Sequence, residues 1–289
     1  MRRLLAPLGV ERFFAEHWQS RMALLPLPEG DLAFIRQVIG PLDPARLAGM
    51  AREGAQAWIA NDFVQHSVFP VDATNAAKFH AAGATLYFIN VELPALTDSL
   101  ADFLGAPRRQ VIASLFFTPG GGGAAPHFDK NENFTVQLTG AKRWQAGEAP
   151  MVPCTPDSYT LGGPVTPALA PLLAKARRPP ERTVDLKPGT LFYLPRGAVH
   201  HTGAGEPSWS LNLSYSPTMW LDLLRVGLQE RLMASPRWRG IVTGAGAKCD
   251  PAARNANPLP ELLAELRGML DDPQEAEALE RAFFERLDG

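Results

Sequence analysis

The sequence predicts a mainly β protein with flanking helices, because three parts of the chain differ in composition and in the spacing of their apolar residues. Between residues 111 and 215, short segments rich in β-branched and aromatic residues alternate with Gly and Pro, which is typical of an antiparallel barrel or sandwich. The parts before and after it carry apolar residues mainly at helical spacing. We therefore expect a helical part over residues 1–80, a barrel over 81–217 and a helical region over 218–289.

Length and composition exclude several classes of protein. A chain of 289 residues can bury a core without disulfides, and its two cysteines, Cys154 and Cys249, stand in no zinc-binding spacing. This cysteine usage fits a reducing compartment, so we expect a cytoplasmic protein. The formal net charge is -2 with Lys and Arg dispersed, which argues against nucleic acid as a partner. No run approaches the roughly 20 apolar residues that a membrane span requires.

The individual elements follow from local periodicity and from the Gly and Pro residues that interrupt it. Helices are predicted in the first part of the chain over residues 10–19, 30–38, 44–60 and 94–104. The clearest strands are predicted over residues 111–118, 133–138, 141–144, 191–194 and 209–215. Further helices are predicted after Pro217, near residues 259–270 and over 273–287. The last of these has a strong start, with Asp272 as a cap, Pro273 at the first position and Glu275 completing a capping-box pattern.

The residues that suggest chemistry lie in the β-rich middle. One residue separates His127 from Asp129, so in an extended segment both side chains point the same way and can share one ion. A third ligand must come from elsewhere, and the best candidate is His200 in the segment Pro195-Arg-Gly-Ala-Val-His-His201. Two imidazoles and one carboxylate form the facial triad of non-haem iron(II) enzymes, which leaves positions open for an oxidant and O2.

A candidate co-substrate site lies beside this triad. Residues 133–144 are predicted to form a hairpin around a Thr139-Gly140 loop. In that register Lys142 lies opposite Gln137 and shares a polar face with it and with Asn133. A dicarboxylate with a 2-oxo acid end would suit this arrangement, because the metal can chelate one end and Lys142 can pair with the far carboxylate. The alternative for Lys142 is a solvated strand lysine.

The segment from Pro126 to Trp144, with the sequence PHFDKNENFTVQLTGAKRW, resembles the JmjC and cupin-4 hydroxylases. That family includes the ribosomal oxygenases and the asparaginyl hydroxylase that inhibits hypoxia-inducible factor. Its members have an HxD pair, a Lys or Arg fifteen residues after its His, and a distal His after a Pro-x-Gly-like turn, which correspond to His127, Lys142 and His200. The asparaginyl hydroxylase shares the His-His pair with its first His as the ligand, which favours His200 over His201.

The resemblance, which covers roughly residues 80–217, implies a fold, an activity and further site residues. The family fold is a double-stranded β-helix, or jelly roll. The implied activity is hydroxylation of a protein, peptide or amino-acid side chain, with iron(II) as the metal and with 2-oxoglutarate and O2 as co-substrates. By position in the family, Asn133 and Asn212 are candidates for contacts near 2-oxoglutarate, and Gln137 and Ser114 are further candidates for the same site.

Two other functions are compatible with the same residues. A cupin-type protein could use the metal for structure or for capture of a small molecule, and act as a non-catalytic sensor. A metal-dependent cupin dioxygenase or isomerase could act without 2-oxoglutarate. The role of Lys142 separates these two functions from the 2-oxoglutarate-dependent hydroxylase, because only the hydroxylase needs the charge of Lys142.

The C-terminal helices are a candidate dimer interface. Leu221, Leu224, Leu228 and Leu232 form one apolar stripe, which exceeds what a single short helix can bury against itself. The sequence therefore indicates a possible homodimer through this region. The alternative is that the stripe packs on the protein's own barrel.

Overall fold

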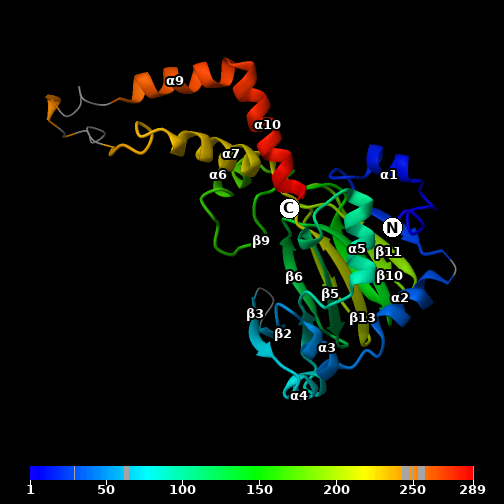
Figure 1. Cartoon of the computed structure of the whole chain (residues 1–289). Coiled ribbons are helices and arrows are strands. Elements are labelled where there is room, and N and C mark those ends of the chain that lie inside the picture. The colour runs from blue at the N-terminus through cyan, green and yellow to red at the C-terminus, as the bar shows by residue number, and fades with distance from the viewer. Residues whose placement is uncertain (29, 62–64, 243–247, 249, 253–257, 289) are drawn as a thin grey trace. The chain divides into compact units, whose positions relative to one another are not determined.

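The computed structural model describes residues 1–28, 30–61, 65–242, 248, 250–252 and 258–288, with side chains 60–67 and 282–289 left out of the description. The chain divides into two compact units, Met1–Pro217 and Thr218–Gly289. The first contains all the described strands, and the second is built from helices (Figure 1).

Two antiparallel sheets make up the centre of the first unit. The larger sheet has eight strands in the order β1-β11-β7-β13-β5-β4-β2-β3. These are β1 (Ala23–Pro26), β2 (Ala55–Asn61), β3 (Gln65–Val71), β4 (Thr85–Phe88), β5 (Val111–Thr118), β7 (Glu132–Thr139), β11 (Thr190–Leu194) and β13 (Ser208–Tyr215). The smaller sheet has five strands in the order β10-β8-β12-β6-β9. These are β6 (Gly123–Phe128), β8 (Lys142–Gly147), β9 (Tyr159–Thr160), β10 (Glu181–Leu186) and β12 (His200–Gly203).

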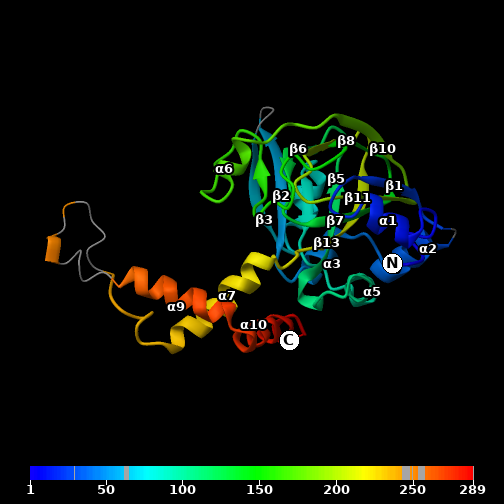
Figure 2. The ribbon, with the colours of Figure 1, turned by 90° about the horizontal axis from the view of Figure 1, so that it is seen from above.

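The two faces of the larger sheet have opposite character because its strands alternate. In β13, Leu211 and Leu213 point into the main apolar core, whereas Ser210 and Asn212 point to the side that faces the smaller sheet. Helices of the N-terminal part cover the apolar face (Figure 2). They are α1 (Val10–Glu16), α2 (Asp31–Ile39), α3 (Pro44–Met50), α4 (Ala76–Ala81) and α5 (Pro94–Leu104), with a short 3-10 turn η2 (Arg108–Gln110) after α5. This arrangement leaves the polar face free to line a site.

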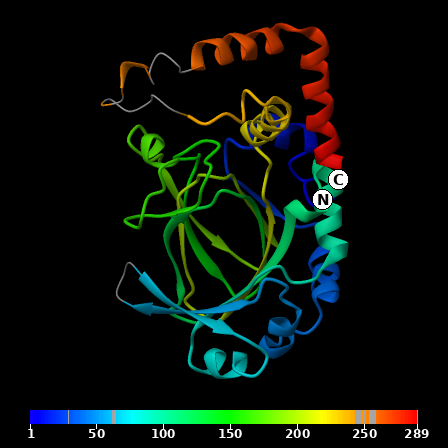
Figure 3. The same ribbon diagram turned by 60° about the vertical axis from the view of Figure 1, so that its left-hand side comes forward.

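The N-terminal part is less helical than predicted. The helix expected over residues 44–60 ends at Met50, and residues Ala55–Asn61 form β2 instead. Figure 3 shows β2 and β3 extending the larger sheet beyond the barrel strands. A short apolar run is compatible with either a helix or a strand, and here pairing of β2 with β3 and β4 decides the outcome.

The predicted hairpin over residues 133–144 is wrong. Strand β7 pairs with β11 and β13 in the larger sheet, whereas β8 pairs with β10 and β12 in the smaller one. The Thr139-Gly140 turn therefore carries the chain from one sheet to the sheet that faces it. Gly140 has a φ of 62°, and a Cβ there would lie 2.3 Å from the carbonyl oxygen of Pro207. A tight turn of this kind fits both topologies, so the local sequence could not distinguish them.

The segment between β8 and β10 packs on the outside of the smaller sheet. It contains β9 and the short helix α6 (Ala170–Leu173). Val152 and Leu169 from this segment form a small core with Phe128 of β6 and with Val199, the residue before β12. Strand β9 pairs with β6 and forms one edge of the smaller sheet, so the segment also extends this sheet beside His127.

The second unit consists of α7 (Trp220–Ala234), α9 (Leu259–Asp271) and α10 (Pro273–Asp288), with α10 in contact with both other helices. Asp272 caps α10 as predicted, because its Oδ1 accepts a hydrogen bond from the backbone N–H of Gln274 at 2.8 Å. Glu275 forms an ion pair with Arg231 of α7. Across the described residues, no helix combines the length and apolar character that crossing a bilayer needs.

Candidate metal centre

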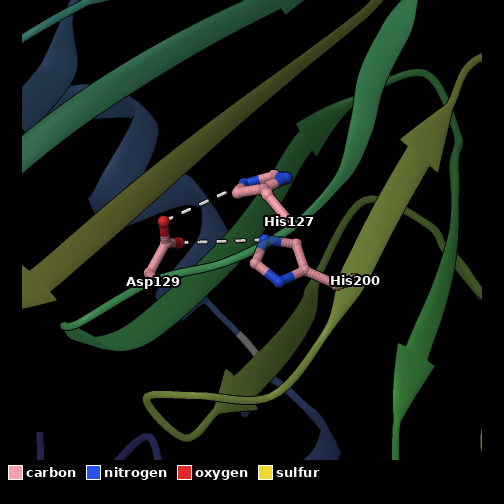
Figure 4. Close-up of side chains that lie close together, drawn as sticks. All are labelled: His127, Asp129 and His200. Carbon is pink, nitrogen blue, oxygen red and sulfur yellow. Dashed lines mark ion pairs between the residues drawn. The ribbon is translucent and has the colours of Figure 1, made fainter. Parts of the chain in front are cut away.

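The side chains of His127, Asp129 and His200 converge at one point between the sheets (Figure 4). His127 lies near the end of β6, and His200 begins the neighbouring strand β12, directly opposite it in the register. The Nε2 atoms of His127 and His200 lie 3.9 and 3.8 Å from the carboxylate oxygens of Asp129. One potential ligand atom from each residue lies within 4.8 Å of the others, a spacing that could hold one metal ion.

Both imidazoles are oriented through their second nitrogen. The Nδ1 atom of His127 lies 2.7 Å from the carbonyl oxygen of Ala125, and that of His200 lies 3.1 Å from the carbonyl oxygen of Ala198. Since a carbonyl can only accept, each Nδ1 carries the proton and each Nε2 keeps a free lone pair. Burial and the neighbouring His127 lower the pKa of His200 to about 4, so its ring is neutral near pH 7. A neutral ring held through Nδ1 is the form in which histidine binds metals.

The carboxylate of Asp129 is held by an amide network. Asn133 donates from Nδ2 to Oδ2 of Asp129 at 2.9 Å. The Oδ1 atom of Asn133 accepts in turn from Asn212 at 3.0 Å and from Ser214 at 2.8 Å. Asn133 and Asn212, both candidate residues from the sequence, therefore lie beside the triad and orient its carboxylate.

A cavity of about 340 Å³ opens between the sheets, with the triad and Lys142 in the same wall. Lys142 points into it from β8 of the smaller sheet. The other side chains that line it are mainly polar and come from both sheets, among them Tyr87, Asn133, Thr135, Ser210 and Asn212. The cavity can hold a small polar molecule between the triad and Lys142.

Lys142 is buried without an acidic partner among the described residues. It is 4 % exposed, and its Nζ lies 3.3 Å from the hydroxyl of Ser210 and 5.5 Å from the ring centroid of Phe116. Burial lowers its pKa to about 7, because nothing nearby compensates for the lost hydration of the ammonium group. An isolated buried cation is costly, and a bound anion would relieve this cost.

Two of the predicted co-substrate residues are not brought to the cavity wall. Gln137 is fully buried, and its Nε2 donates to the carbonyl oxygen of Thr139 at 2.9 Å. Ser114 is buried and hydrogen-bonds with Tyr87. His201, next to the candidate ligand His200, pairs with Gln145 in the register, and its buried Nδ1 has no hydrogen-bond partner.

The cavity wall contains aromatic residues that the sequence did not predict as site residues, among them Tyr87 and Trp144. Tyr87 of β4 stacks on Phe116 with ring centroids 4.4 Å apart, and burial raises its pKa. Trp144 stacks on His200 with centroids 5.4 Å apart and an interplanar angle of 20°. Trp144 could have been found, because it stands two residues after Lys142 on the same face of a strand. Tyr87 carried no comparable signal, since β4 was not predicted.

Close backbone contact between β6 and β12 yields a test of this arrangement. A Cβ added to Gly123 would lie 1.9 Å from the carbonyl oxygen of Thr202, so Gly123→Ala must push the strands apart. We expect it to lower the free energy of unfolding by about 2–3 kcal/mol, measured by denaturant titration. Gly203→Ala is the control, because a Cβ added there would lie 4.0 Å from the carbonyl oxygen of Gly122, so little change is expected. Equal effects of the two changes would contradict this packing.

Residues 92–223 match the family model described as JmjC domain. These residues are therefore similar to JmjC domains. The chain is 27% identical over 250 residues to ribosomal oxygenase 2 of Rattus norvegicus, covering 76% of this chain and 48% of that protein. It is 25% identical over 271 residues to ribosomal protein uL16 3-hydroxylase of Escherichia coli (strain K12), covering 89% and 65% respectively. The chain therefore spans less than two thirds of the length of these relatives.

A solved structure has the same fold as this chain. YcfD, a ribosomal oxygenase from Escherichia coli in complex with cobalt and 2-oxoglutarate, superposes with a TM-score of 0.55 at 22% identity. The match covers 94% of this chain and 70% of that one. The predicted jelly-roll core with helical flanks is thereby confirmed. His127, Asp129, Lys142 and His200 all lie inside the residues that match the JmjC family model.

Proposed function

We propose that this protein is an iron(II)- and 2-oxoglutarate-dependent dioxygenase that hydroxylates a side chain of a protein or peptide. The observation that carries the proposal is the buried, uncompensated Lys142 in the same cavity wall as the triad of His127, Asp129 and His200. A triad alone fits many metal proteins. A triad with a buried cation in one chamber suits a co-substrate with a chelating end and a distant carboxylate.

The residues of the triad fit iron(II). Two neutral imidazoles and one carboxylate are the donor set of non-haem iron(II) oxygenases, and the three donors leave coordination positions for other ligands. When bound, the iron would supply activation of O2, and 2-oxoglutarate would supply two electrons by its decarboxylation to succinate. The amide network behind Asp129 would keep the carboxylate in place as ligands exchange.

The remaining cavity residues would bind and orient the co-substrate. The ammonium of Lys142 and the hydroxyl of Ser210 offer a charge-assisted site for its far carboxylate. The aromatic rings of Phe116 and Tyr87 lie at that end of the cavity and would limit access of water to it. Low local polarity strengthens the pairing of Lys142 with an anion, since competing hydration is weak.

A protein substrate is supported by the relatives, which are named for ribosomal oxygenation and for hydroxylation of ribosomal protein uL16. The test is anaerobic loading with iron(II) and 2-oxoglutarate, exposure to O2 with candidate proteins and peptides, and mass spectrometry for a gain of one oxygen. Succinate should form even without substrate, through uncoupled turnover. Absence of both succinate and 2-oxoglutarate consumption would contradict the proposal.

The pH dependence of stability follows from Lys142. Its pKa is about 7 in the folded protein and 10.5 in its ordinary state, so above pH 7 unfolding takes up a proton. The free energy of unfolding of the metal-free protein should therefore rise between about pH 7 and pH 10 through this group. Below pH 7 the lysine is charged in both states, and the folded protein bears the full free-energy cost of burying that charge. Denaturant unfolding of wild type and Lys142→Met at pH 6, 7.5 and 9 measures the difference. A difference that is constant with pH would contradict the assignment.

We also propose that the C-terminal helices mediate a homodimer. The described helices of this unit expose several large apolar side chains: Trp220, Leu221, Leu224, Met233, Leu259, Leu263 and Leu270. Such an apolar surface is typical of a subunit interface. Leu224→Glu should convert a dimer into a monomer in light scattering at micromolar concentration, whereas Gln229→Glu on the same helix should not. A monomeric wild type would contradict the proposal.

The cysteines support a cytoplasmic location as part of the proposal. Cys154 is free and exposed, and Cys249 lies outside the described residues. Exposed free thiols are typical of proteins in reducing compartments.

A further inference from the structure

A buried ionic cluster lies next to the metal centre but outside the cavity wall. Glu132 at the start of β7 and Tyr193 of β11 are fully buried, and Arg196 is 8 % exposed. None of the three lines the cavity. They have no part in binding the co-substrate or the metal as described above, so their burial needs another explanation.

The cluster is held by Glu132. One carboxylate oxygen, Oε2, accepts from the hydroxyl of Tyr193 at 2.6 Å and from the backbone N–H of Arg196 at 3.4 Å. The other, Oε1, lies 3.8 Å from Nε of Arg196, and neither of these two atoms has a hydrogen-bond partner. Burial raises the pKa of Glu132. An ion pair with such incomplete hydrogen bonding is a poor source of stability.

The turn that contains Arg196 contacts two of the three candidate ligands. The backbone N–H of Gly197 donates to the carbonyl oxygen of Asp129 at 2.8 Å. The carbonyl oxygen of Ala198 accepts from Nδ1 of His200 at 3.1 Å. The position of this turn therefore determines both the position of the backbone at Asp129 and the orientation of the His200 ring.

Glu132 connects this turn to the strand that carries Asn133 and to the N-terminal part. Its neighbour in sequence, Asn133, donates to the carboxylate of Asp129. Tyr193, which donates to Glu132, accepts in turn from the backbone N–H of Gln19 at 2.8 Å. One buried carboxylate thus lies where the metal-site turn, the strand behind Asp129 and the N-terminal segment meet.

We propose that Glu132 is a positioning residue of the metal centre, which acts by holding the turn of residues 195–199. The carboxylate anchors the backbone N–H of Arg196, and the two following residues transmit that position to Asp129 and His200. The inference rests on the proposed function in one respect, that this centre binds a divalent metal ion.

Cobalt(II) binding to the purified metal-free protein tests the proposal, because both its affinity and its visible absorption report on ligand geometry. Glu132→Gln should weaken cobalt(II) binding by about 10-fold to 100-fold, as loss of supporting contacts does at other metal sites, and should change the absorption spectrum. Asp31→Asn is the matched control. Asp31 is a 5 % exposed carboxylate paired with Arg3 at 2.8 Å, on the helix-covered side of the larger sheet, and its loss should leave cobalt(II) binding unchanged.

A double variant separates positioning from stability. Glu132→Gln combined with Arg196→Gln removes both buried charges, so it should regain thermal stability relative to Glu132→Gln while cobalt(II) binding stays weak. Wild-type affinity and spectrum in Glu132→Gln, or full recovery of binding in the double variant, would overturn the inference. If Glu132→Gln does not fold, the double variant decides alone. Failure of the wild type to bind cobalt(II) would instead overturn the proposed function.

Discussion

Replacing Asp129 by Ala is expected to weaken binding of iron(II) by more than about 100-fold, since even the loss of contacts behind a ligand costs 10-fold to 100-fold. Asp129 supplies the carboxylate of the triad, and its oxygens lie 3.9 and 3.8 Å from the Nε2 atoms of His127 and His200. Without it, two neutral imidazoles remain, and no other described carboxylate joins them. Anaerobic calorimetry with iron(II), or with cobalt(II) as a spectroscopic substitute, measures the loss.

A control with the same chemical change lies in β10 of the smaller sheet. Asp185 of β10 pairs with Arg143 at 2.8 Å, and both side chains are well exposed. Asp185→Ala should therefore leave metal binding within about twofold of wild type, since an exposed ion pair contributes little free energy to the folded structure. Unchanged metal affinity in Asp129→Ala would mean that the ion binds elsewhere.

Replacing Lys142 by Met is expected to weaken 2-oxoglutarate binding on the order of 100-fold to 1,000-fold, the equivalent of about 3–4 kcal/mol for a buried charged partner. The Met side chain keeps the apolar stem but removes the one Lys or Arg side chain that lines the cavity within the described part of the chain. Calorimetry of 2-oxoglutarate with metal-loaded protein measures this. Metal affinity should hardly change, because Lys142 is not among the three clustered ligands.

Lys187→Met is the control for this change, because Lys187 is exposed and follows β10 outside the cavity. It should bind 2-oxoglutarate like wild type. If Lys142→Met also binds it like wild type, the co-substrate is not held by this residue. The metal site would then suit a sensor, or a cupin dioxygenase or isomerase that does not use 2-oxoglutarate.

The sequence by itself determined the fold class and the residues that meet at the candidate metal centre. Strand β13 shows why. Its strict alternation of Ser and Asn with apolar residues assigns Asn212 to a polar face and Leu211 to the core, whatever the neighbouring strands are. The HxD pair and the turn before His200 are likewise local patterns with a fixed chemical meaning. Local periodicity predicts such features because it depends only on residues close in sequence.

The tertiary structure alone decided how Lys142 reaches the cavity. The predicted hairpin placed it beside Gln137 on one sheet, whereas it points in from the facing sheet and Gln137 is turned to the Thr139 carbonyl. The same holds for Tyr87, which enters the site through pairing of β4 with β5. Pairing partners and facing sheets are set by contacts between residues far apart in the chain, and their energies depend on the whole packed core rather than on any local pattern.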